Sequence, residues 1–264
     1  MRGLIAGASY PFRAAALIAR TPALWPFLIV PVLVNVAVGV LVYAGLLFAG
    51  LRGIDRLMAG LPPELGVVEP LLQAVLIVVL LLVTGFVFVR FGVILGAPWY
   101  EALSARVEKE RTGALPDTGR GGLLGALRDV FRQVGHEGQK LGFVFGLGSL
   151  LLLLSLIPAA GTVLATVGGI ALGATVACLD FHDPPLSRRR LSFGEKLRLV
   201  GRGLPASAGF GLVALTLVSV PFVNLLSVPV CVVAGTLLYV DRVRARLDAR
   251  DAQAAARASS TPTS

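Results

Sequence analysis

Four long stretches of this chain carry no charged side chain, and they restrict the folds that it can adopt. They cover residues 21–51, 70–89, 141–179 and 204–240 of a 264-residue sequence. The hydrocarbon core of a bilayer is about 30 Å thick, so a helix crosses it with roughly 20 apolar residues. Only 15% of the residues are charged, whereas a soluble domain carries roughly 25%. The sequence therefore predicts an all-helical integral membrane protein.

The lengths of the stretches predict two kinds of membrane segment. The first two are expected to be long transmembrane helices, and Pro22, Pro26 and Pro31 predict a kink or a strong tilt in the first. The other two are each interrupted near the middle, by IPAAG at 157–161 and by VPFVN at 220–224. We therefore expect the third and fourth stretches to form helical hairpins.

Two arrangements fit these hairpins. Each is either a pair of minimal spans with a tight turn at the far surface, or a re-entrant hairpin whose apex stays within the membrane. The apex carries no charge, and an apolar apex is more stable in hydrocarbon than among headgroups. We favour re-entrant hairpins, which require protein to cover their unpaired backbone groups.

The distribution of lysine and arginine predicts the topology. With loop 52–69 on one side and everything else on the other, 22 of the 24 Lys and Arg residues share a side. The positive-inside rule makes that side cytoplasmic, with both termini inside, in a bacterial inner membrane. The net charge of +9 then follows from topology and indicates no nucleic-acid partner. Residues 1–250 are expected to form one membrane domain, and residues 251–264 a disordered cytoplasmic tail.

The amino-terminal segment is expected to lie on the membrane surface. If residues 2–20 form one helix, Arg2, Arg13 and Arg20 share a face while the apolar residues lie mostly on another. This pattern is typical of a helix in the interface, with a bend at Pro11.

Motifs for catalysis and for cofactors are missing from the sequence. It contains no GxxxxGK[ST] phosphate loop, and His136 and His182 have no spacing typical of metal ligands. Cys178 and Cys231 lie in apolar segments, where buried thiols are expected. We expect no enzyme activity, no cofactor and no metal.

Charges gather between the third and fourth stretches, in CLDFHDPPLSRRRLSF at 178–193. Residues 180–202 are expected to form a cytoplasmic hinge between the hairpins, in which Asp and Arg pair and Pro184 with Pro185 ends the helix. The three consecutive arginines can also concentrate anions near a pore mouth. The candidate hinge residues are Asp180, His182, Asp183, Arg188, Arg189 and Arg190.

This hinge segment, continued by GEKLR, resembles the corresponding loop of the CysZ sulfate permease family, which includes the etoposide-induced-protein relatives. Four other segments are similar in the same order: RTPALWPFLIVPVLVN, GAPWYEALSARVE, TGALPDTG and VPFVNLLSVPVCVVAGTLLYVDR. The resemblance covers roughly residues 10–246. It implies two long spans, two hairpins that enter the membrane partway, and an inorganic anion as substrate.

The start of the first span departs from that family. Its members carry a Gly-Leu-Arg or Gly-Ile-Arg-Arg stretch that holds sulfate, but here the positions read PALWP and the arginine is missing. Thr21 as N-cap with Pro22 at the first helical position still leaves N–H groups that favour an anion, and Arg20 can supply charge. Alternatively, this is an ordinary helix start with Trp25 as an interfacial anchor. The anion-binding candidates are Arg20, Thr21, Pro22, Ala23, Leu24 and Trp25.

A second candidate site follows the second span, in GAPWYEALSARVEKE at 96–110. We expect Pro98 to restart a helix at the membrane surface, with aromatic side chains in the headgroup belt and charged ones beyond it. A constriction lined by Glu and Arg can gate an anion path, while the alternative is a solvated helix with pairs such as Arg106 and Glu110. The pore or gate candidates are Trp99, Tyr100, Glu101, Arg106 and Glu108.

Together these features predict a pathway for sulfate or a related oxyanion, without ATP hydrolysis. One chain has few spans with which to surround a hydrophilic pore, so a homo-oligomer is expected. The alternative is a non-transporting membrane protein that shapes the bilayer or binds partner proteins.

Overall fold

The computed structural model describes residues 2–60, 62, 66, 68–115, 122–220, 223–245 and 247–249. These residues form helices and contain no strand, which confirms the predicted all-helical class. The helices are α1 (Arg2–Ala8), α2 (Tyr10–Arg20), the 3-10 helix η1 (Pro22–Leu24), α3 (Pro26–Met58), α4 (Val68–Thr112), α5 (Gly122–Leu154), α6 (Ala160–Arg188), α7 (Phe193–Arg202), α8 (Ala206–Ser219) and α9 (Val223–Arg242). The predicted tail at 251–264 and residues 221–222 of the second break lie outside the described residues.

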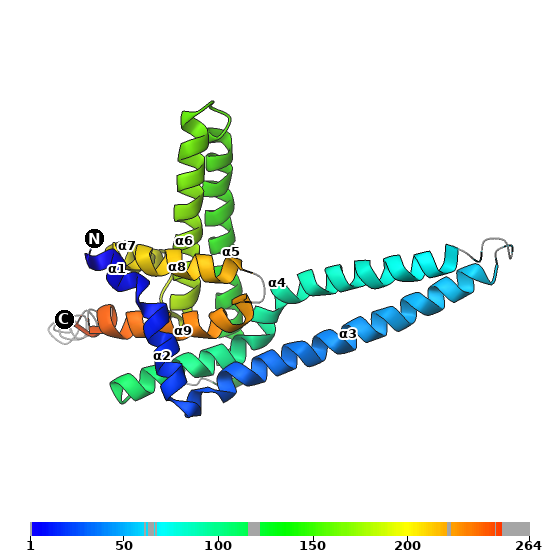
Figure 1. Cartoon of the computed structure of the whole chain (residues 1–264). Helices are drawn as coiled ribbons and strands as arrows, with labels where there is room; N and C mark the ends of the chain where they lie inside the picture. Colours follow the sequence, from blue (N-terminus) through cyan, green and yellow to red (C-terminus); the bar gives the residue numbers. More distant parts are fainter. Residues whose placement is uncertain are drawn as a thin grey trace.

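Two long helical hairpins leave a common packed body in different directions (Figure 1). One hairpin is α3 with the first part of α4, and the other is α5 with α6. We call the packed body the hub; it consists of α1, α2, α7, α8 and α9 with residues 96–112 of α4 and 174–188 of α6. Helices far apart in the sequence therefore meet in the hub.

The hairpin arms have the length and composition of membrane helices. Four described segments are long and apolar enough to cross a bilayer: Pro22–Met58, Val68–Gly85, Gly135–Leu154 and Ala160–Arg188. Their apolar side chains are largely exposed in the single chain, as at Leu41, Leu82 and Phe145. Such surfaces are stable against lipid or against another apolar protein surface. By contrast, α8 has only 14 residues, which is about 21 Å of helix.

The breaks predicted in the third and fourth stretches are confirmed. α5 ends at Leu154 and α6 begins at Ala160, so the turn lies at IPAAG. α8 ends at Ser219 and α9 begins at Val223, so the second break lies at VPFVN. At the first turn Ala159 has a positive φ of 62°, the conformation that reverses the chain.

The core of the hub surrounds α9. Leu237 of α9, Phe210 of α8, Leu103 of α4 and Tyr10 of α2 all belong to one buried cluster. Two glycines let the helix backbones meet here. A Cβ atom on Gly211 of α8 would lie 2.1 Å from the Ala174 carbonyl oxygen of α6. A Cβ atom on Gly235 of α9 would lie 2.0 Å from the Phe181 carbonyl oxygen. α6 is therefore held by direct backbone contact on two sides.

Two predicted helix boundaries at prolines are wrong. α4 continues through Pro98, where a new helix was expected to begin, and α6 continues through Pro184 and Pro185 to Arg188. Each proline removes one backbone hydrogen bond. The turns that follow are buried in the hub, at Leu103 after Pro98 and at Leu186 after the proline pair. Packing of these turns offsets the lost hydrogen bonds and keeps each helix continuous.

The amino-terminal segment is two helices, because the break falls at Ser9 and not at Pro11. The Ser9 hydroxyl donates to the Ala6 carbonyl at 2.8 Å, and Pro11 lies within the first turn of α2. α1 packs on α8, and α2 packs on α9. The face of α2 with Tyr10, Ala14 and Ile18 is buried against the hub while Arg13 and Arg20 are exposed, and the apolar Phe12 is exposed as well.

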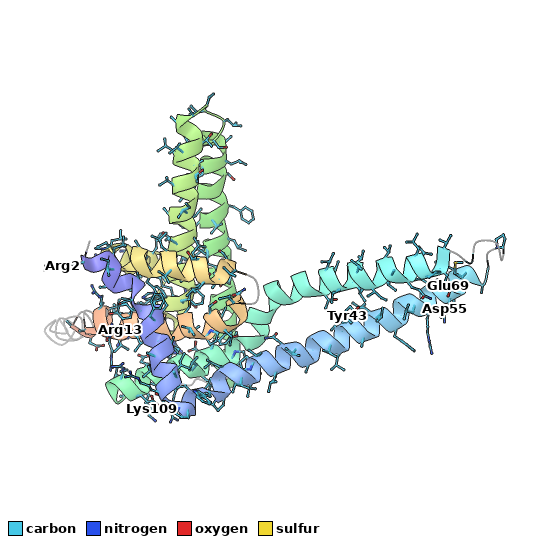
Figure 2. The ribbon with its side chains drawn as sticks, viewed as in Figure 1. Arg2, Arg13, Tyr43, Asp55, Glu69 and Lys109 are labelled. Carbon is cyan, nitrogen blue, oxygen red and sulfur yellow. The ribbon has the colours of Figure 1, made fainter. Side chains whose placement is uncertain are left out.

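Charge is distributed unevenly along the α3–α4 hairpin. Figure 2 shows Asp55 and Glu69 near the end of this hairpin that is far from the hub. Arg13 and Lys109 lie at the hub instead. The hub also holds Arg188, the last residue of α6, which Arg189 and Arg190 follow directly. In all, residues 52–69 at the far end hold three acidic and two basic side chains.

Candidate functional site

The second half of α4 places three polar side chains on one face. Glu101, Ser104 and Glu108 are separated by three and four residues, so their side chains follow one another along the helix. All three face Arg188, the last residue of α6. Arg106 lies on the other side of α4, where its Nε donates to Glu110 at 2.8 Å. The predicted Arg106–Glu110 pair is therefore confirmed, and the arginine that meets Glu101 and Glu108 is Arg188.

Arg188 contacts these three side chains through different nitrogens. Nη1 lies 2.5 Å from Glu101 Oε1, and Nη2 lies 2.6 Å from Glu108 Oε2. Nε also donates to Glu108 Oε2 at 3.1 Å, and Nη2 donates to Ser104 Oγ at 2.9 Å. Arg188 thus ties the end of α6 to α4.

A chain of hydroxyl groups extends this contact to α9. Ser104 Oγ lies 2.8 Å from Thr236 Oγ1, and Thr236 donates its proton to the Val232 carbonyl. Thr236 has only one proton, so Ser104 donates to Thr236 and accepts from Arg188. We call Arg188, Glu101, Ser104, Glu108 and Thr236 the Arg188 cluster; it joins α4, α6 and α9.

The members of the Arg188 cluster differ in their contact with solvent. The Glu108 side chain is 0% exposed, that of Arg188 is 10% exposed, and that of Glu101 is 49% exposed. Glu108 Oε1 is buried without a hydrogen-bond partner among the described residues. The pKa of Glu101 is raised, because partial burial of its carboxyl outweighs the stabilisation of its charge by Arg188. The carboxylates of Glu101 and Glu108 therefore share one guanidinium. When both are ionised, the Arg188 cluster has a net charge of −1.

The two hinge carboxylates have lysines as their partners, one on α5 and one on α7 within the hinge itself. Lys140 of α5 lies 2.9 Å from Asp180 of α6. Lys196 of α7 is buried and contacts Asp183, and it donates to Ser187 at 2.9 Å. The hinge carboxylates accept from lysines because α5 and α7 pack along this part of α6.

The other hinge candidates lie in three different environments. His182 is buried, and its Nδ1 donates to the Cys178 carbonyl at 2.8 Å. Arg189 contacts Asp248 beyond α9, and its guanidinium lies 6.0 Å from the centre of the Tyr239 ring. Arg190 is exposed with a φ of 54°, where the chain turns toward α7. The three arginines thus do not form one cationic patch.

The start of the first span is a 3-10 turn. Thr21 is the residue before η1 with Pro22 at its first position, as predicted, but the Thr21 side chain makes no capping hydrogen bond. The N–H groups of Thr21, Leu24 and Trp25 donate to carbonyls within the chain, and prolines have no N–H. The Ala23 N–H is the remaining backbone donor of this turn.

The side chains at this start also differ in their exposure. Leu24 is fully buried, while Arg20 is exposed at the end of α2. Trp25 is half-exposed, and its Nε1 donates to the Ile18 carbonyl at 3.0 Å. The Trp25 indole therefore links the start of α3 to α2. Arg20 is the cationic side chain available to an anion at the start of the first span.

The aromatic pair before the Arg188 cluster is divided between core and surface. Tyr100 is buried and Trp99 is partly exposed. Burial raises the pKa of the Tyr100 hydroxyl. The Tyr100 ring folds back over Gly96, where a Cβ atom would lie 2.5 Å from the ring.

Three buried residues of these networks were absent from the sequence-based candidates. Ser104 and Thr236 are buried hydroxyls in apolar helices, and Lys196 is a buried lysine. A signal existed for Ser104, because it lies between two glutamates on one helix face. No local pattern links Thr236 or Lys196 to partners on other helices.

The comparisons with known proteins extend over most of the chain. A sequence model of the family described as Sulfate transporter CysZ/Etoposide-induced protein 2.4 matches residues 10–229. A sulfate transporter CysZ of Pectobacterium atrosepticum is 30% identical over 227 residues, which are 84% of this chain and 80% of the relative. Proteins of the same name from Salmonella typhimurium and Vibrio cholerae serotype O1 are 29% and 27% identical over 226 residues, covering 85% and 84% of this chain and 88% of each relative. The chain belongs to the sulfate transporter CysZ/etoposide-induced protein 2.4 family.

Proposed function

We propose that this protein provides a pathway for sulfate or a related oxyanion across the bacterial inner membrane, without ATP hydrolysis. One observation carries the proposal: relatives named sulfate transporters match it over 80% to 88% of their own length. The family model, which matches residues 10–229, extends over both hairpins and most of the hub. The sequence offers no phosphate loop that would couple transport to a nucleotide.

The Arg188 cluster is our candidate gate. A buried charged side chain is costly unless it is paired, and a constriction lined by Glu and Arg can gate an ion path. The cluster links three hub helices through one guanidinium, so breaking its bonds would let α6 move relative to α4 and α9. Arg20, Thr21 and Ala23 at the start of the first span remain the proposed first anion contact.

The proposed topology has both termini and the hinge at residues 180–202 on the cytoplasmic side of the membrane. Loop 52–69 at the far end of the α3–α4 hairpin carries only two of the 24 Lys and Arg residues, which supports this orientation. The short α8 supports a hairpin that enters the membrane only partway. Exposed apolar side chains along the arms are consistent with a homo-oligomer. Cysteines placed at Gly60 and at Arg189 test the orientation, because an external maleimide should label only the first.

Flux measurements in proteoliposomes test the function. Purified protein in sealed vesicles should carry radiolabelled sulfate down its gradient without nucleotide, and the initial rate should saturate with sulfate concentration. Arg188→Lys should lower the rate because a lysine cannot keep the forked contacts, while Arg106→Lys on the exposed side of α4 should keep it. Vesicles that show no anion-dependent flux, with folded protein inside, would favour a role in bilayer shaping or partner binding.

A further inference from the structure

The guanidinium of Arg188 has two sides with different surroundings. Nε and Nη2 face Glu108 and Ser104, which are both buried. Nη1 faces Glu101, and about half of the Glu101 side chain is exposed. The first side packs α4 against α6 through buried groups. The second side is held by the more exposed of the two carboxylates, so displacing Glu101 would free Nη1.

Glu101 shares its cationic partner, the Arg188 guanidinium, with Glu108. The groups that face it or its neighbours are Glu108 of α4, Arg188 and Asp183 of α6, and Tyr239 of α9. Lys196 of α7 contacts Asp183 and compensates it. Glu108 already takes two bonds from Arg188, and its buried Oε1 has no partner within the described part of the chain. The cluster therefore keeps an excess of one negative charge.

We propose that the Nη1 side of Arg188 is a binding site for an inorganic oxyanion such as sulfate, and that Glu101 occupies it when charged and vacates it on taking up a proton. This inference rests on the proposed sulfate pathway for its ligand. Arg188 is then the residue that contacts the anion, and Glu101 is a competitor built into the chain.

The chemistry of the contact supports an oxyanion. A guanidinium binds the oxygens of carboxylate, sulfate and phosphate with the same planar fork, so the Glu101 carboxylate marks where an oxyanion can sit. A protonated carboxyl is neutral and a weaker acceptor, so it competes less for Nη1. Since the cluster holds one excess negative charge, a proton on Glu101 also removes the repulsion that an incoming anion would meet.

The direction of the pH dependence follows from linkage. If a proton on Glu101 strengthens oxyanion binding, then a bound oxyanion strengthens proton binding by the same factor. Sulfate affinity should therefore rise as the pH falls through the pKa of Glu101. The pKa of Glu101 is raised by partial burial, so the rise begins at a higher pH than for an ordinary glutamate. Sulfate and a proton would then enter the site together.

Titration calorimetry with sodium sulfate tests the site. The full chain is placed in phosphatidylcholine nanodiscs and titrated at pH 5.5 and at pH 7.5. Wild type should bind sulfate more tightly at pH 5.5, and Glu101→Asp should keep this dependence. Glu101→Gln should bind sulfate about threefold to tenfold more tightly than wild type at pH 7.5, because the variant no longer has a charged carboxylate that competes for Arg188 at this half-exposed position. It should also lose most of the pH dependence.

Glu110→Gln is the matched control. Glu110 lies on the same helix in an exposed pair with Arg106, and its substitution changes the net charge by the same amount. Equal sulfate affinity in Glu110→Gln and Glu101→Gln would assign the gain to net charge and overturn the site. Nanodiscs that contain phosphatidylglycerol test the other source of an oxyanion. If sulfate binding disappears in them, a lipid phosphate takes the place and the proposal of free sulfate is wrong.

The outcome is separable from that of the flux assay. If sulfate flux is saturable but Glu101→Gln changes neither affinity nor pH dependence, the Arg188 site is wrong and the proposed function stands. If flux is absent but sulfate binds with the expected effect of Glu101→Gln, the site stands and the transport function is wrong. If neither wild type nor folded Glu101→Gln shows saturable sulfate binding, the site is overturned.

Discussion

Replacing Glu108 by alanine should destabilise the protein strongly. The change removes two hydrogen bonds from Arg188 and leaves a guanidinium that is 10% exposed without its buried counter-charge. Removing one partner of a buried ion pair costs about 3–5 kcal/mol. Arg188 keeps Glu101 and Ser104, so the expected loss lies near the lower end, at about 3 kcal/mol. For a chain of this size that is a fall in melting temperature of about 6–12 °C.

Thermal unfolding of the purified protein in detergent measures this effect. Glu110→Ala is the control, because it breaks an exposed i,i+4 pair with Arg106 and should cost less than about 0.5 kcal/mol. A Glu108→Ala melting temperature within about 2 °C of that control would refute the reasoning.

A double substitution distinguishes two causes of the instability: the cost of leaving Arg188 unpaired in a buried position, and the loss of a net stabilising ion pair. Glu108→Leu combined with Arg188→Met removes both charges and replaces them with apolar side chains of similar volume. A buried pair replaced in this way often loses little stability. The double variant should therefore melt above Glu108→Ala. A lower melting temperature for the double variant would mean that the pair itself contributes the stability.

Three further predictions concern packing, the hairpin tip and the first span. Gly235→Ala should cost about 1–3 kcal/mol in thermal unfolding, because its Cβ would lie 2.0 Å from a backbone oxygen, whereas Gly142→Ala meets no atom within 4 Å and should melt like wild type. Ala160→Lys should cost about 2.5–3.5 kcal/mol if the tip lies in the membrane, and wild-type expression would favour a tip in water. Trp25→Arg should tighten sulfate binding about tenfold to a hundredfold in calorimetry if the start of the first span binds the anion, and an unchanged affinity would argue against that site.

The hairpins were predictable from the sequence because their signals are local. Uncharged length indicates a membrane segment, and a proline or glycine within an apolar run indicates its break. The turns at 155–159 and after Ser219 follow from those signals alone. The helix ends at Pro98 and at Pro184 did not follow, because buried neighbours on other helices keep the chain helical beyond each proline.

The charge partners were predictable only within one helix. Arg106 and Glu110 lie four residues apart, and helix geometry alone brings them together. Arg188 lies 80 residues from Glu108 and 87 from Glu101 in sequence. The spacing of the two glutamates places them on one face of α4 and predicts a cation opposite them. Which cation it is depends on how the hairpins dock, and no local pattern records that.

The dense charge at the end of α6 follows from its position at a junction of elements. Asp180 binds a lysine of α5, Asp183 binds a lysine of α7, Arg188 binds two glutamates of α4, and Arg189 binds Asp248. Consecutive helix positions point in different directions, so each charge of the segment reaches a different neighbour. A solvated hinge would place no such demand on every charge. Of the two carboxylates on Arg188, the half-exposed Glu101 can leave at less cost in buried contacts than the fully buried Glu108, and we therefore propose that an anion enters the network at Glu101.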